Sequence, residues 1–172
     1  MSLDYWHLSL STVQLAFRYL DVEYKVTGTA QFRFRQGSDW YYLRYDHLPE
    51  LFFEREVDPM RFLPERFSLN TLFSAMNSVN DKYHLVKVAV QEDGNLIFRL
   101  CLREDRYLSF REAFFQYVRE LDDAVESFAI ACKICVTDEE DGEAEKGIPY
   151  DKISEWLRKE EYHFFNKKDV QS

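Results

Sequence analysis

The N-terminal part of the chain shows the apolar spacing of an amphipathic helix. Between residues 9 and 20, apolar side chains recur every three or four positions, at Leu10, Val13, Phe17 and Leu20. This spacing places them on one face of a helix. Ser9, Ser11 and Thr12 can cap its N-terminus. The pattern therefore predicts a first helix over residues 9–20.

The period then changes to two, which is typical of β-strands. Apolar and polar residues alternate over residues 22–26 and 32–35, and aromatic-rich runs follow at 40–45 and 51–57. Gly28 and the pair at residues 37–38 interrupt these runs where turns are needed. The pattern predicts an antiparallel meander of three or four strands.

Two helices and a hairpin are expected in the second half. Ser68 is a candidate cap for a helix over residues 69–79, and β-rich runs at 85–90 and 96–102 flank the turn signal Asp93-Gly94. Ser109 and Glu112 match a capping box and predict a long final helix of about 25 residues. Helices segregated from hairpins indicate an α+β fold, with an antiparallel sheet packed by helices.

The composition changes after this helix. We expect residues 1–136 to form the α+β domain, residues 137–147 an acidic linker, and residues 148–172 an amphipathic C-terminal arm. The length of 172 residues suits a single main domain.

The net charge of the chain bears on the kinds of partner that it can bind. The net charge of −9 argues against a nucleic acid or an anionic membrane as partner. The first residues lack the cationic start and apolar core of a signal peptide, and apolar runs of about five residues are too short to span a membrane. We therefore expect a cytoplasmic protein with no membrane attachment.

Candidate chemistry is sparse. Cys132 and Cys135 form a lone C-x-x-C that closes a helix, where the dipole disfavours a thiolate, and with Cys101 they are expected to be reduced structural thiols. The four histidines are isolated in the sequence, and five glycines are too few for a glycine-rich phosphate loop. We expect no enzyme activity, no cofactor and no metal.

Several local features resemble the YbjN family, whose fold is similar to that of the dimeric chaperones of type III secretion. They are the stretch Met76–Val88, in which an asparagine-bearing helix end leads into a hairpin strand, the helix end Leu20–Tyr24, and the long helix after Ser109. The resemblance covers roughly residues 9–134. It implies a chaperone-like protein that binds extended segments of partner proteins, with a homodimer as a candidate assembly, and family labels also suggest a sensory or regulatory role.

The aromatic content of 17% exceeds the need of one face of a small sheet. Adjacent strand residues point to opposite faces, so some aromatic side chains are expected on an uncovered face, where apolar patches mark interaction sites. The candidate partner-binding residues are Phe32, Phe34, Trp40, Tyr42, Leu51, Phe53 and Trp156. Two occupants remain open for that face, a partner protein or the C-terminal arm itself. A ligand-responsive regulatory domain with a pocket between sheet and long helix is the alternative function.

Overall fold

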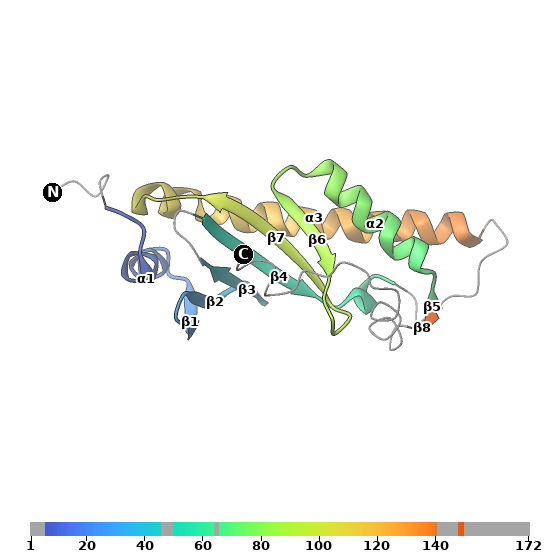
Figure 1. The fold of residues 1–172 in the computed structure, drawn as a ribbon, viewed down its shortest axis with the longest axis horizontal. Coiled ribbons are helices and arrows are strands. Elements are labelled where there is room, and N and C mark those ends of the chain that lie inside the picture. Colours follow the sequence, from blue (N-terminus) through green and yellow to red (C-terminus); the bar gives the residue numbers. More distant parts are fainter. Residues whose placement is uncertain (1–5, 46–49, 64–65, 141–147, 150–172) are drawn as a thin grey trace. The chain divides into compact units, whose positions relative to one another are not determined.

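The computed structural model describes residues 6–45, 50–63, 66–140 and 148–149. Its helical elements are α1 (Leu10–Tyr19), η2 (Pro59–Arg61), α2 (Leu69–Lys82) and α3 (Tyr107–Glu140). Its strands are β1 (Glu23–Gly28), β2 (Gln31–Gln36), β3 (Asp39–Arg44), β4 (Glu50–Val57), β5 (Arg66–Phe67), β6 (Val86–Val90), β7 (Leu96–Arg103) and β8 (Ile148–Pro149) (Figure 1). The expected α+β class is confirmed.

Six of these strands form one sheet in the order β1-β2-β3-β4-β7-β6, and β5 pairs with β8 in a second, two-stranded sheet. Strands β1 to β4 follow one another as antiparallel neighbours, which confirms the expected meander. Strands β6 and β7 confirm the expected hairpin, and Gly94 occupies its turn at a φ of 86°. Glycine adopts this left-handed conformation without steric cost.

The contacts divide the chain into two compact units, and β4, β7 and α3 contribute residues to both. Unit 1 comprises Met1–Arg55 and Arg99–Leu121, and unit 2 comprises Glu56–Phe98 and Asp122–Ser172. Helix α3 continues to Glu140, past the expected domain boundary at residue 136. The rest of the expected linker, residues 141–147, and nearly all of the arm lie outside the described residues.

The core of unit 1 is aromatic. Phe17 of α1 lies 5.5 Å from Phe32 and 5.6 Å from Phe34, measured between ring centroids, and Phe114 of α3 lies 5.6 Å from Phe17. Phe53 of β4 continues this cluster, with its ring 5.8 Å from that of Phe114. Edge-to-face and tilted ring pairs of this kind add stability beyond their buried area. Helices α1 and α3 therefore anchor the same face of β2 and β4.

Both ends of α1 are satisfied by local hydrogen bonds. The Ser9 hydroxyl accepts from the Thr12 amide and the Thr12 hydroxyl accepts from the Ser9 amide, which completes a capping box. At the other end, the Val22 amide donates to the Phe17 carbonyl, and Asp21 adopts a φ of 54°. This is the geometry of a Schellman motif, which ends the helix where the sequence changes period.

In unit 2, the side chain of Asn80 joins α2 to the edge of β6. Its Nδ2 donates to the carbonyl of Val88 at 3.2 Å, and its Oδ1 accepts from the Val88 amide at 2.8 Å. The Lys87 ammonium donates to the carbonyls of Asn80 and Tyr83, at the C-terminal end of α2. The asparagine in the stretch 76–88 thus has a structural role, because it satisfies the backbone of an edge strand.

The predicted start of the final helix is wrong. Helix α3 begins at Tyr107, so Ser109 lies inside its first turn and cannot act as the N-cap of a capping box with Glu112. The Tyr107 amide donates to the carbonyl of Trp6 at 2.9 Å. The carbonyl of Trp6 therefore accepts a hydrogen bond from an amide of the first turn, which an N-cap side chain would otherwise accept. The sequence around Tyr107 does not indicate this interaction.

We expect Asn80→Ala to lower the free energy of unfolding by about 1–3 kcal/mol, because the buried amide and carbonyl of Val88 would lose their partners. Asn77→Ala is the matched control, since Asn77 is exposed on the same helix and both changes raise helix propensity alike. Urea unfolding followed by circular dichroism measures both. Equal stability of the two variants would contradict the role assigned to Asn80.

Candidate functional site

The predicted partner-binding residues lie on two different faces of the sheet. Phe32, Phe34, Leu51 and Phe53 are each 0% exposed. The rings among them contact the aromatic side chains of α1 and α3, so these four residues are core residues and are unavailable to a partner. Alternation along a strand separates its residues into two faces, but it does not show which of the two faces the helices cover. Trp156 lies outside the described residues.

Trp40 and Tyr42 lie on the opposite face, which we call the outer face. Because Tyr41 and Leu43 are buried with the core, the residues that alternate with them on β3 point the other way. The cross-strand register extends this face, since Arg35 is opposite Trp40 and Arg33 is opposite Tyr42. The outer face of unit 1 thus includes Glu23, Lys25, Arg33, Arg35, Trp40, Tyr42, Arg44, Phe52, Glu54 and Arg99.

Three cations surround the indole of Trp40, and we call this group the tryptophan–cation cluster. Distances to the ring centroid are 4.4 Å for Arg33 Cζ, 5.6 Å for Lys25 Nζ and 6.0 Å for Arg35 Cζ. Each cation is attracted by the negative face of the ring. Trp40 itself is half-buried, and Lys25 and Arg35 are exposed. A concentrated positive charge therefore lies at the surface of a chain whose net charge is −9.

Among the residues that the structure describes, these cations have few partners with which to form ion pairs or hydrogen bonds. Arg35 Nη1 lies 3.8 Å from the Glu23 carboxylate, at the outer limit of an ion pair between exposed groups. Arg33 Nε is shielded from solvent and has no hydrogen-bond acceptor among the described residues. A buried donor without an acceptor costs about 1–3 kcal/mol. Arg33 thus contacts the ring of Trp40 while its Nε has no acceptor among the described residues.

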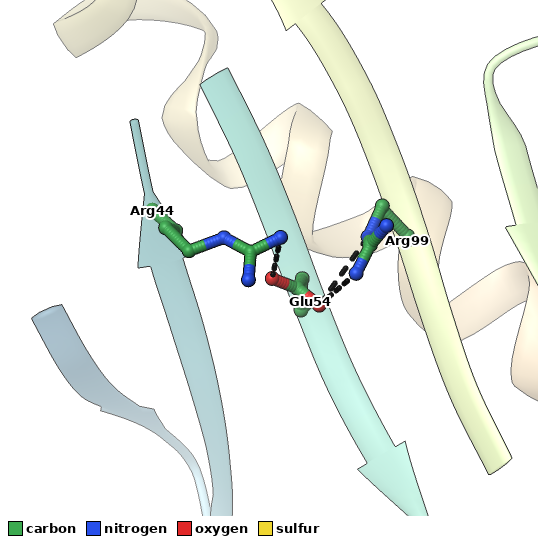
Figure 2. A network of polar contacts seen from close by, with 3 residues as sticks. All are labelled: Arg44, Glu54 and Arg99. Atoms are coloured by element: carbon green, nitrogen blue, oxygen red, sulfur yellow. Dashed lines mark hydrogen bonds and ion pairs between the residues drawn. The ribbon is translucent and has the colours of Figure 1, made fainter. Parts of the chain in front are cut away.

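Next to this cluster, one carboxylate joins three strands (Figure 2). Glu54 Oε1 of β4 lies 3.2 Å from Arg44 Nη2 of β3, and Glu54 Oε2 accepts from Nε and Nη2 of Arg99 of β7 at 3.3 and 3.0 Å. Glu54 is only 4% exposed and Arg99 7%. Both guanidinium groups also contact the ring of Phe52. The distance to the ring centroid is 5.4 Å from Arg44 Cζ and 5.5 Å from Arg99 Cζ. We call these residues the carboxylate–arginine network.

Of the three cysteines, the structure describes the side chains of Cys101 and Cys132, and neither thiol has the surroundings of a nucleophile. Cys132 is fully buried in α3, and Cys101 lies at the surface of β7 with its thiol partly shielded. This burial raises the pKa of the Cys101 thiol, the Glu50 carboxylate raises that pKa further, and the Arg99 guanidinium opposes the rise. Little Cys101 thiolate is therefore present at neutral pH.

The histidines do not converge where they are described. His7 and His84 are both exposed, and His47 and His163 lie outside the described residues. In the described part of the chain, no group of three histidine, cysteine, aspartate or glutamate side chains could hold a metal ion. No helix there is both long enough and apolar enough to cross a membrane.

Sequence reasoning missed Lys25, Arg33, Arg35 and the carboxylate–arginine network. The available signal was a two-residue alternation of cations and aromatics along β2 and β3. That alternation alone does not show that the cations converge on Trp40, because the convergence depends on the cross-strand register. Glu54 could have been noticed as an acid inside the otherwise apolar start of a strand, but its partner on β7 is 45 residues away.

Comparison with known proteins found no match to this chain among family models, curated proteins or solved structures.

We expect Glu54→Gln to lower the free energy of unfolding by about 3 kcal/mol, because it removes the anion between two buried guanidinium groups. Glu50→Gln is the matched control, since Glu50 lies on the same strand but is exposed, and it should change stability by less than about 0.5 kcal/mol. Denaturant unfolding measures both variants. A loss for Glu54→Gln within the range of the control would show that the network is dispensable.

We also expect Cys101 to react slowly with iodoacetamide at neutral pH. A raised pKa moves the midpoint of the rate above the value of about 8.5 typical of a free cysteine. Glu50→Gln should lower this midpoint in part, because one of the groups that disfavours the thiolate becomes neutral. Peptide-level mass spectrometry follows the reaction, with Glu92→Gln at the exposed hairpin turn as control. A midpoint at or below that of free cysteine would contradict the burial of this thiol.

Proposed function

We propose that this chain is a non-enzymatic, chaperone-like binding module that holds an extended segment of a partner protein against the outer face of unit 1. One observation carries the proposal. Trp40 and Tyr42 point away from a core that already contains a continuous set of aromatic rings, and they are only half-buried. Tryptophan and tyrosine are enriched at protein interfaces, because each combines a large apolar ring with a group that can form a hydrogen bond.

The side chains on the outer face are suited to binding a partner more than to catalysing a reaction. Indole, phenol and guanidinium groups supply stacking, cation–π contacts and hydrogen-bond donors. A sheet surface of this kind suits an extended segment, because both repeat their side chains at intervals of about 7 Å on one side. The resemblance of the stretch 76–88 to the YbjN family, whose fold is similar to that of secretion chaperones, supports the same function by analogy.

Selection from a displayed library of random peptides of about 12 residues, each about 40 Å long when extended, tests this proposal with the full chain as bait. We expect the wild type to enrich a recurrent set of peptides. The double variant Trp40→Ala, Tyr42→Ala should lose that enrichment, because it removes both aromatic side chains from the outer face.

Tyr19→Ala is the control, since Tyr19 is 64% exposed on α1 and is absent from the outer face. Thermal melting checks that all variants are folded, and Trp40→Phe serves as a milder change that keeps an aromatic ring. No enrichment by the wild type, or enrichment that the double variant retains, would overturn the proposal.

A further inference from the structure

We infer that the held segment is acidic, with carboxylates at alternate residues that pair with Arg33 and Arg35. This inference rests on the proposed function, because it names the chemistry of the segment that the outer face would hold. It follows from the spacing, orientation and charge of the tryptophan–cation cluster.

The spacing of the two arginines matches that of an extended peptide. Arg33 and Arg35 are two residues apart on β2, so both side chains lie on the outer face, about 7 Å apart along the strand. An extended partner repeats its own side chains on one face with the same interval. Two acidic residues separated by one other residue would therefore reach both guanidinium groups without distortion.

The contact with Trp40 leaves N–H groups of the arginines available to donate hydrogen bonds to carboxylates. A guanidinium stacked on an aromatic ring uses its planar face for that contact, and its N–H groups lie along its edge. A carboxylate can accept two parallel hydrogen bonds from such an edge. Arg33, whose Cζ lies 4.4 Å from the ring centroid, is the best placed, and its Nε still lacks an acceptor among the described residues. A small rotation of this guanidinium would offer Nε–H to a partner carboxylate.

The tryptophan–cation cluster carries a net positive charge, which acidic side chains of a partner can neutralise. Within the part of the chain that the structure describes, the three cations around Trp40 have one acidic partner, Glu23, whose carboxylate lies 3.8 Å from Arg35 Nη1. The excess of two positive charges on the outer face of β1 and β2 complements two carboxylates. A polynucleotide fits less well, because phosphate binding relies on a longer series of cations than the three that lie around Trp40.

The probes are labelled peptides of about 12 residues with glutamate at every second position and threonine or tyrosine between. A twin peptide carries glutamine in place of every glutamate, and an oligouridylate of similar length represents single-stranded RNA. Binding to the full chain is measured by fluorescence anisotropy. We expect the glutamate peptide to bind at least about tenfold more tightly than its glutamine twin, as charge-assisted hydrogen bonds would provide. Its affinity should fall as salt is added.

Variants assign the effect to the cluster. The double variant Arg33→Gln, Arg35→Gln should abolish the preference for the glutamate peptide, and Arg33→Lys should retain part of it, because lysine keeps the charge but loses the planar fork. Arg119→Gln is the control, since it removes one exposed arginine from α3. The comparison of the two peptides on the wild type stands even if the double variant fails to fold.

The outcomes separate this inference from the proposed function. If both peptides bind equally, or the preference survives in the double variant, the inference is overturned and the binding module stands. If neither peptide binds and the random library shows no enrichment, the proposed function falls and the inference with it. Tighter binding of oligouridylate than of the glutamate peptide, lost in the double variant, would overturn the choice of a peptide.

Discussion

The fold of unit 1 depends on one buried carboxylate. Glu54 lies between guanidinium groups from β3 and β7, and removing three charged groups from water is costly unless they are paired closely. The consequence is less a gain in stability than a choice of strand register. A slip of β4 by one residue would turn Glu54 toward the aromatic core and would move Phe53 out of it. The network thus favours the register in which Phe53, and not Glu54, faces the helices.

That choice explains the use of the aromatic residues. Phe17, Phe34, Phe53 and Phe114 contact one another as rings on the inner face, and each is fully buried. Aromatic residues are large and rigid, so few other side chains are needed to fill the space between short elements. The aromatic residues that are buried among the described residues therefore serve the core, whereas Trp40, Tyr42 and Phe52 lie on the outer face.

Local features were predictable, and features that depend on distant pairing were not. The cap of α1 at Ser9, the cap of α2 at Ser68 and the Gly94 hairpin follow from short-range chemistry, and the structure contains all three. The start of α3 was missed because its first amide is satisfied by Trp6, about 100 residues away. Alternation showed that Phe32 and Phe34 share a face, but only the positions of α1 and α3 show that this face is the core. The cluster around Trp40 needed the register of three strands.

Asn80 has a consequence beyond the hydrogen bonds it makes. Its amide meets both the N–H and the C=O of Val88 and so takes the place of a neighbouring strand at the edge of the sheet. Unpaired edge strands are templates for the addition of further chains, and natural proteins suppress them with polar side chains, charges and bulges. The side chain of Asn80 closes this edge at its centre, while Lys87 adds a charge beside it. Because the N–H and C=O of Val88 are both engaged by Asn80, another chain could pair with β6 at this position only by displacing that side chain.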